Sequence, residues 1–226
     1  MVFKRVVFKL IFCILVFLIN SRFSFSQKAF FNLELGGGVG IMRDLLDYSE
    51  PKPEMKEQVR FSYNAGISRN YLPNKYIRWG FGLSFVQINS REDMKLILID
   101  SVGAMPGSDS FTDYFHASYF AVPIYFGYKI GDFCITMGFQ TAIGFYHKER
   151  SVGAGIDGGT PFHYDHTRSW LHFGEIDYGI KPMISYIMSP KISSKIEYFY
   201  GRNKPIFTGV YGWRNEYLTI GMMYRL

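Results

Sequence analysis

The segment YFAVPIYFGYKIGDF, residues 119–133, decides the fold class because large apolar residues recur in it at every second position. One face of the expected strand carries large apolar side chains: Phe120, Val122, Ile124, Phe126 and Tyr128. The other face carries a smaller and more polar set: Ala121, Pro123, Tyr125, Gly127 and Lys129. This period of two predicts a β-strand whose two faces meet different environments.

Pro123 lies in the middle of this strand, although proline cannot donate a ladder hydrogen bond. We expect Pro123 to lie on the inward-facing side of the strand and to curve the strand through a bulge or a local bend. A functional opening of the wall between neighbouring strands is the alternative interpretation.

The same alternation continues along the chain, which is rich in phenylalanine, tyrosine and glycine. We expect strands in eight segments: 29–40, 58–71, 76–89, 115–130, 132–147, 169–188, 191–201 and 215–226. This composition and spacing predict an all-β protein.

The connections between these segments alternate in length. The long ones are polar and cover residues 41–57, 90–114, 148–168 and 202–214. The short ones are turns at residues 73–75, 131–132 and 189–191. An even number of strands with this layout predicts an eight-stranded antiparallel transmembrane β-barrel with short periplasmic turns and long extracellular loops.

The two faces of the strands indicate which side meets lipid. The large apolar set is too voluminous for the interior of eight strands, which holds little more than packed side chains. We therefore expect it to face the bilayer, and a soluble lipocalin-like barrel with reversed faces is the rival. The charged residues expected inside are of both signs, so they can pair there: Glu34, Arg60, Arg78, Lys129, Glu175, Asp177, Lys181, Lys195, Glu197 and Arg225.

The N-terminus has the pattern of a secretory signal peptide, with basic residues before the apolar run 10–19 and small residues before Gln27. We expect residues 1–26 to be this signal and residues 27–226 to be the barrel domain of the outer membrane. Removal of four basic residues lowers the formal charge from +6 to +2, so we expect no nucleic-acid partner. Cys134 then remains alone, which leaves no intrachain disulfide.

Four short motifs resemble the PorT-like outer-membrane β-barrel family of Bacteroidota. They are LELGGGVG (33–40), FAVPIYFGYKIGDF (120–133), TAIGFYH (141–147) and EYLTIGMMYRL (216–226). The resemblance implies a barrel in the outer membrane and a link to type IX protein secretion. It also implies that the partners, beyond the lipid bilayer, are envelope or secretion-machinery proteins.

Residues 161–175 contain the groups that could carry chemistry. His163, Asp165, His166 and His172 have spacing that can bind a metal, although we expect a solvated loop there and no metal. His166, Ser169 and Glu175 could form a hydrolase triad, but Ser169 lacks a nucleophile-elbow context.

The apolar run MKLILID, residues 94–100, lies inside a predicted loop. We expect it to extend the neighbouring strands beyond the membrane, and an exposed edge that adds a partner's strand is the alternative.

No phosphate loop, dinucleotide fingerprint or paired-cysteine motif is present, so we expect no cofactor. The function that these patterns favour is a non-enzymatic barrel, acting as a structural or interaction component of the cell envelope. A narrow channel, a small-ligand barrel and a lipid-modifying enzyme are the alternatives.

Overall fold

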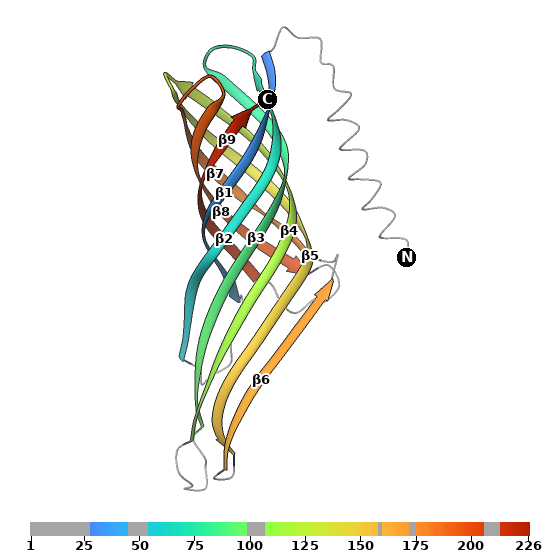
Figure 1. Cartoon of the computed structure of the whole chain (residues 1–226), viewed down its shortest axis with the longest axis vertical. Helices are drawn as coiled ribbons and strands as arrows, with labels where there is room; N and C mark the ends of the chain where they lie inside the picture. Colours follow the sequence, from blue (N-terminus) through green and yellow to red (C-terminus); the bar gives the residue numbers. More distant parts are fainter. Residues whose placement is uncertain (1–27, 45–53, 99–106, 158–159, 172–174, 206–212) are drawn as a thin grey trace, which may run out of the picture.

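A computed structural model describes residues 28–44, 54–98, 107–157, 160–171, 175–205 and 213–226, and all of the secondary structure in these ranges is β (Figure 1). The strands are β1 (Lys28–Asp44), β2 (Glu54–Leu72), β3 (Ile77–Leu98), β4 (Gly107–Ile130), β5 (Phe133–Asp157), β6 (Thr160–Leu171), β7 (Glu175–Ile187), β8 (Ile192–Pro205) and β9 (Trp213–Arg225). The described residues contain no helix that is long and apolar enough to cross a membrane. The expected signal peptide lies outside the described residues.

Eight of the strands close into an antiparallel ring. Each of β1 to β4 pairs with the next strand in sequence, β5 pairs with β7, and β7, β8 and β9 follow in order. The β1–β9 ladder, which begins at Asn32↔Arg225 and ends at Asp44↔Trp213, closes the ring. The eight-stranded antiparallel barrel predicted from the sequence is therefore confirmed.

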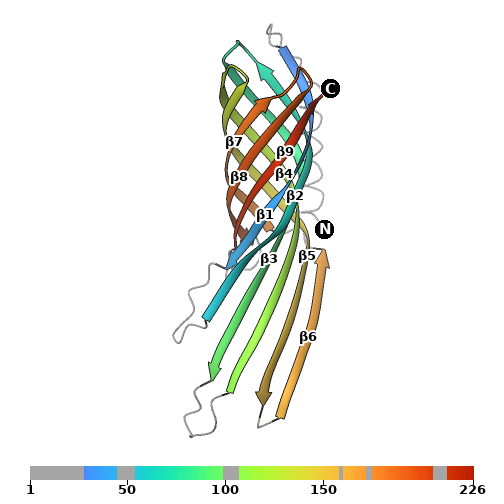
Figure 2. The same ribbon diagram turned by 60° about the vertical axis from the view of Figure 1, so that its left-hand side comes forward.

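β6 lies outside this ring and pairs with the outer half of β5, from Tyr146↔Leu171 to Asp157↔Thr160. Figures 1 and 2 show β3, β4, β5 and β6 running together well beyond the barrel, at the end opposite the C-terminus. The segments 90–114 and 148–168 were predicted to be loops, and this prediction is wrong for most of their length. Both contain long strands, because polar residues on both faces suit a sheet that stands in water. The predicted strand 169–188 is likewise divided between the end of β6 and the whole of β7.

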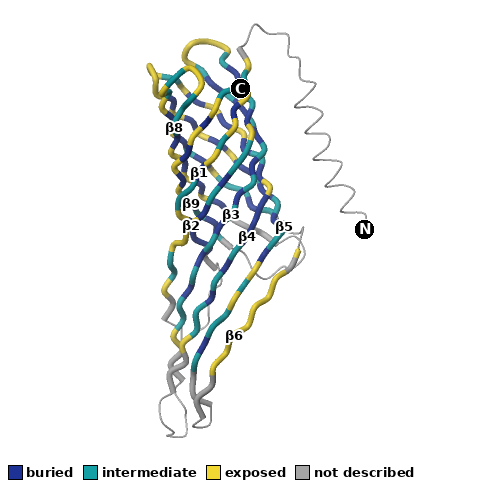
Figure 3. Tube along the Cα trace, in the orientation of Figure 1, coloured by how far each residue is buried: buried dark blue, intermediate teal, exposed yellow. Residues whose placement is uncertain are grey.

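Large apolar side chains are exposed on the outer wall of the barrel, as predicted, and small or polar residues alternate with them inside. Buried and less buried positions alternate along the strands of the ring (Figure 3). Examples from six strands of the ring are Leu35, Ile67, Ile124, Phe139, Ile180 and Ile220. A soluble barrel would reverse these faces, since water disfavours so large an apolar surface. The belt is the lipid-facing surface of a transmembrane barrel, and a bacterial barrel of this kind lies in the outer membrane.

Aromatic residues mark both edges of this apolar belt. Near the short turns, the rings of Tyr76 and Tyr128 stack with centroids 5.6 Å apart. Toward the other end, Phe120 and Phe145 stack at 4.5 Å, and Phe85 joins them. Aromatic girdles of this kind lie at the two membrane–water interfaces.

Pro123 faces the lumen, as predicted, but it does not form a bulge. The β3–β4 register is the same on both sides of it, and the ladder only lacks the pairs between Phe81↔Ile124 and Ser84↔Ala121. The missing donor thus interrupts the ladder locally without shifting it. The register shift of the β4–β5 pair falls instead between Ser118 and Tyr119, close to the point where the sheet leaves the barrel.

The three short turns lie at the end of the barrel that holds both the start of β1 and the end of β9 (Figure 1). In the β2–β3 turn, the Asn74 side-chain oxygen accepts hydrogen bonds from the backbone of Tyr76 and Ile77. In the β4–β5 turn, Gly131 has a φ of 59°, a left-handed conformation that glycine adopts without strain. By the usual arrangement of outer-membrane barrels, this end faces the periplasm.

The belt predicts how charge on the outer wall affects stability. Phe139 is 51% exposed on the wall, so Phe139→Arg should place a cation in lipid and lower the free energy of unfolding by about 2–4 kcal/mol. Thr167→Arg on β6, which is exposed outside the belt, should leave it unchanged. Denaturant unfolding of the barrel in lipid vesicles, followed by gel mobility of unboiled samples, measures both. Equal effects of the two substitutions would contradict a lipid-facing belt.

Candidate functional site

The middle of the lumen is crossed by a buried ionic network, which we call the lumen network and which comprises Glu34, Lys181, Lys195 and Glu197. The Lys195 ammonium lies 2.7 Å from Glu34 Oε2 and 3.0 Å from Glu197 Oε2. The Lys181 ammonium lies 3.2 Å from Glu197 Oε1. The side chains of Lys195 and Glu197 are each 1% exposed, so the pairing offsets a large desolvation cost.

Neutral polar groups from two other strands complete this network. The Thr219 hydroxyl donates to Glu197 Oε1 at 3.1 Å, and the Asn64 amide donates to the same oxygen. The Ser68 hydroxyl donates to Glu34. Gly36 leaves room for this arrangement, since a Cβ there would stand 2.6 Å from the Asn64 side-chain oxygen. The carboxylates are therefore held from several directions, which fixes the packing of the lumen.

A second polar layer lies in the lumen beside the network. The Asn215 amide donates to Asp177 Oδ2 at 2.9 Å and to the Tyr119 hydroxyl at 3.1 Å. The Tyr217 hydroxyl donates to Gln140 Oε1 at 3.1 Å. Tyr119 and Tyr217 also belong to a buried, mainly apolar cluster, whose other members are Met42, Val86, Ile88, Phe115, Ala117, Ala121, Ala142 and Phe199. Side chains thus fill the described lumen, as expected for eight strands.

The predicted inward charges agree with the structure at most positions that it describes. Asp177, Lys181, Lys195 and Glu197 are buried in the lumen. Arg60 is an exception, because it is exposed and its guanidinium lies 5.4 Å from the Tyr114 ring. The β2–β3 register shifts between Val59 and Tyr63, and this irregularity carries Arg60 out of the lumen.

Beyond the belt, β2 to β6 form a continuous sheet that we call the extracellular sheet. It comprises residues 54–59 of β2, 90–98 of β3, 107–115 of β4, 147–157 of β5 and the whole of β6. Polar side-chain contacts occur within and between its strands. Asp93 accepts hydrogen bonds from Arg91 at 2.8 Å, Gln58 at 2.6 Å and Thr112 at 2.9 Å. Burial raises the pKa of Asp93, but the hydrogen bonds from Arg91 and Thr112 outweigh it, so the pKa lies below the ordinary value.

The predicted metal and triad residues lie on or beside β6, and they do not converge. His163, Asp165, His166 and Ser169 are all exposed, and Asp165 pairs with Arg150 at 2.8 Å. His166 and Ser169 are three positions apart, so they point to opposite faces of a strand. No group of metal-binding side chains occurs among the described residues. His172 lies outside the described residues, as does the side chain of Glu175.

The run 94–100 extends a strand, as the favoured interpretation predicted. Residues 94–98 belong to β3 and pair with β4 as far as Leu98↔Gly107, while Met94 and Lys95 also pair with β2. Residues 99 and 100 lie outside the described part. Residues 96–98 pair with β4 alone among the described residues, and β6 has a longer unpaired edge.

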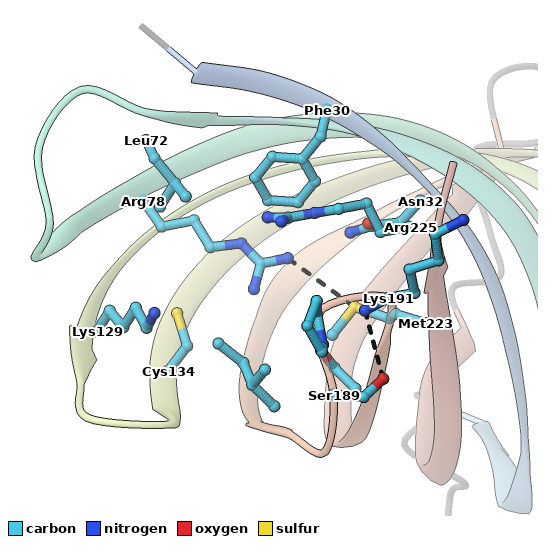
Figure 4. A pocket seen from close by; sticks show the side chains of 13 residues that line it. Phe30, Asn32, Leu72, Arg78, Lys129, Cys134, Ser189, Lys191, Met223 and Arg225 are labelled. Carbon is cyan, nitrogen blue, oxygen red and sulfur yellow. Dashed lines mark hydrogen bonds between the residues drawn. The ribbon is translucent and has the colours of Figure 1, made fainter.

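A cavity of about 330 Å³ opens at the short-turn end of the lumen. Figure 4 shows Arg78 from β3, Lys129 from β4 and Arg225 from β9 reaching toward it, with the Phe30 ring above. The sequence predicted these three charges to be inside, but it could not show that they share one cavity. The sequence analysis also missed the neutral hydrogen-bond partners of the inward charges, which are Asn64, Asn70 and Thr219. The available signal was that each alternates with apolar residues and so faces the lumen.

The lumen network predicts a large loss of stability when one partner is removed. Glu197→Ala would leave Lys195 and Lys181 with less compensation in a buried site, so the free energy of unfolding should fall by about 3–5 kcal/mol. Asp165→Asn, in the exposed pair with Arg150, should leave the unfolding midpoint nearly unchanged. Urea titration of the barrel in detergent compares them, and a small effect at Glu197 would contradict a structural network.

Asp93 predicts an acid response that is confined to the extracellular sheet. Its folded pKa is lowered, so its contribution is complete above the unfolded value of about 3.9 and is lost as the pH falls toward the folded pKa. Backbone amide exchange in β2, β3 and β4 near Asp93 should therefore accelerate below about pH 4. The Asp93→Asn variant should lack this step, and an identical step in the variant would assign it to another group.

No protein-family model matches this chain, and no curated protein is similar to it in sequence. Among solved structures it is similar to Neisserial surface protein A, with 13% identity and a TM-score of 0.45 over 88% of this chain and 99% of that chain. It is also similar to Ail, the attachment invasion locus protein of Yersinia pestis, with 12% identity and a TM-score of 0.40 over 88% of this chain and 99% of that chain. It is similar as well to the outer membrane protease OmpT from Escherichia coli, with 10% identity and a TM-score of 0.45 over 91% of this chain and 99% of that chain. The assignment of this chain as an outer-membrane barrel rests on its own closed ring and apolar belt.

Proposed function

We propose that this protein is a non-enzymatic outer-membrane barrel that presents the extracellular sheet to a protein partner. The observation that carries the proposal is β6, which forms one edge of that sheet along its whole length. Within the described residues β6 pairs with β5 alone, so its other edge offers backbone donors and acceptors. An edge of this kind can accept a strand from another protein.

The surface of β6 favours a specific polar partner over general aggregation. Residues 163–169 are exposed without interruption, so both faces of the strand meet water. They include His163, Asp165, His166 and Arg168, and natural edge strands use charged side chains to limit unwanted pairing. A partner strand would need to complement these charges, and its register would be set by them.

The alternatives have less support. A channel needs a continuous path, but the lumen network and the adjoining layers fill the described lumen. A hydrolase triad needs converging side chains, but His166 and Ser169 lie on opposite faces of β6. An anchored barrel with an exposed sheet edge requires neither a path nor a reactive group.

The resemblance to the PorT-like family gives a more specific proposal for the kind of partner. The motifs at residues 120–133 and 216–226 support it, and they would place the barrel in an envelope assembly linked to type IX protein secretion. In that assembly the barrel would be an interaction component, with the extracellular sheet as one of its contact surfaces.

Site-specific crosslinking in intact cells tests the role of β6. A photoreactive residue at Tyr164, on the exposed edge strand, should yield a discrete protein adduct. The same residue at Tyr200, which is exposed on the lipid-facing wall, should not yield this adduct. Single proline substitutions at Asp165 and at His166 distinguish the two edges of β6. Successive backbone N–H groups point to opposite sides of a strand, so only one of these prolines blocks the free edge.

The proline whose N–H lies on the free edge should abolish the adduct without changing the heat-dependent gel mobility of the barrel. An adduct that both prolines leave intact would exclude strand addition. An adduct equally strong from Tyr200 would exclude the extracellular sheet as the contact surface.

A further inference from the structure

The cavity at the short-turn end differs from the rest of the lumen in its charge balance. In the lumen network, Lys181 and Lys195 each have a carboxylate within 3.2 Å. The cations that line the cavity, Arg78, Lys129, Lys191 and Arg225, have no such ion pair with any described residue. Four cations, of which Lys191 lies in the exposed turn between β7 and β8, therefore share a partly enclosed mouth without an ion-paired carboxylate. Such an arrangement attracts an anion.

The contacts of the two arginines leave donors directed at the cavity. Arg78 uses Nε to donate to Asn70 Oδ1 at 2.9 Å, while one of its terminal nitrogens meets only the Met223 sulfur at 3.9 Å. A thioether is a weak acceptor, so this edge of the guanidinium lacks a strong one. The Arg225 guanidinium lies 3.6 Å from the centroid of the Phe30 ring, which holds it in place without accepting its hydrogen bonds.

The number and origin of these cations indicate the shape of the anion. Arg78, Lys129 and Arg225 come from three different strands and reach into the cavity from different sides (Figure 4). A carboxylate has two oxygens in one plane and is satisfied by a single arginine fork. A tetrahedral oxyanion can accept from three directions at once, so it fits this arrangement better.

The walls and volume of the cavity indicate that the anion carries a small organic group. Phe30, Leu72 and Met223 contribute apolar surface between the cations. The cavity volume of about 330 Å³ is the volume that roughly ten water molecules occupy in the liquid. This is more than a bare phosphate ion needs.

We propose that this cavity is a binding site for a phosphate monoester or a phosphate headgroup, with Arg78, Lys129 and Arg225 as its ligands. The phosphate could come from a soluble ester or from an anionic phospholipid of the adjacent leaflet, because the cavity opens at the same end of the barrel as the stacked rings of Tyr76 and Tyr128. This site is independent of the extracellular sheet, which lies at the opposite end of the barrel.

Calorimetric titration of the folded full-length barrel with glycerol 3-phosphate tests this site, with glycerol as the uncharged control. Wild-type protein should bind the phosphate ester saturably and more weakly as the salt concentration rises. Arg225→Gln and Lys129→Gln should each weaken binding at least tenfold. Lys75→Gln is the matched control, because Lys75 is an exposed lysine at the same end that does not line the cavity, and it should change affinity less than twofold.

Heat-dependent gel mobility establishes that each variant is folded, and two separate lysine and arginine variants keep the test valid if one fails to fold. Repeating the titration in nanodiscs of phosphatidylcholine and of phosphatidylglycerol separates the two sources. A tenfold lower apparent affinity in phosphatidylglycerol would assign the site to the lipid headgroup, and equal affinity would assign it to a soluble ester. Absence of saturable binding to wild-type protein, or wild-type affinity in both variants, would overturn the proposal.

Discussion

The structure depends on the need of every backbone N–H and C=O group in lipid to find a partner within the protein. Lipid supplies no donors or acceptors, so a spanning sheet must close on itself. Here the β1–β9 ladder closes it, and the chain brings Asn32 and Arg225 together from opposite ends of the sequence. Once the ring is closed, successive side chains along each strand point alternately to the lipid outside and to the narrow lumen inside.

The narrow lumen then dictates which residues face inward. Glycine, serine, asparagine and threonine fit beside a few charged side chains, and those charges must be matched because little water remains. Lys195 between Glu34 and Glu197 is the centre of this arrangement. The network is therefore a consequence of ring closure, and it makes the barrel a solid anchor for the extracellular sheet.

Ring closure also explains what could be predicted from the sequence. The eight strands, the short turns and the inward charges follow from a pattern that lipid and lumen impose together. β6 was missed because both of its faces meet water, so residues 163–169 show no apolar alternation. The pairing of Glu34 with Lys195 could not be predicted, because these residues are 161 positions apart in the sequence. Their contact depends on the registers in which β1 and β8 each pair with β9. Pro123 was placed on the correct face, but the register shift falls at Ser118 because the sheet separates from the barrel near that point.

The ends of the barrel differ because ring closure constrains them differently. Past the outer girdle, β2 to β6 no longer need to close, since water can satisfy a free edge, and β6 keeps one along its length. At the short-turn end the strands stop within the ring, so the inward positions of their last residues still converge. Arg78, Lys129 and Arg225 occupy such positions, whereas the acidic residues of the lumen network lie deeper. The same inward parity therefore produces a neutralised plug in the middle of the barrel and an excess of positive charge at its mouth, so the two surfaces available to partners are of opposite kinds: an open backbone edge outside and a cationic cavity on the periplasmic side.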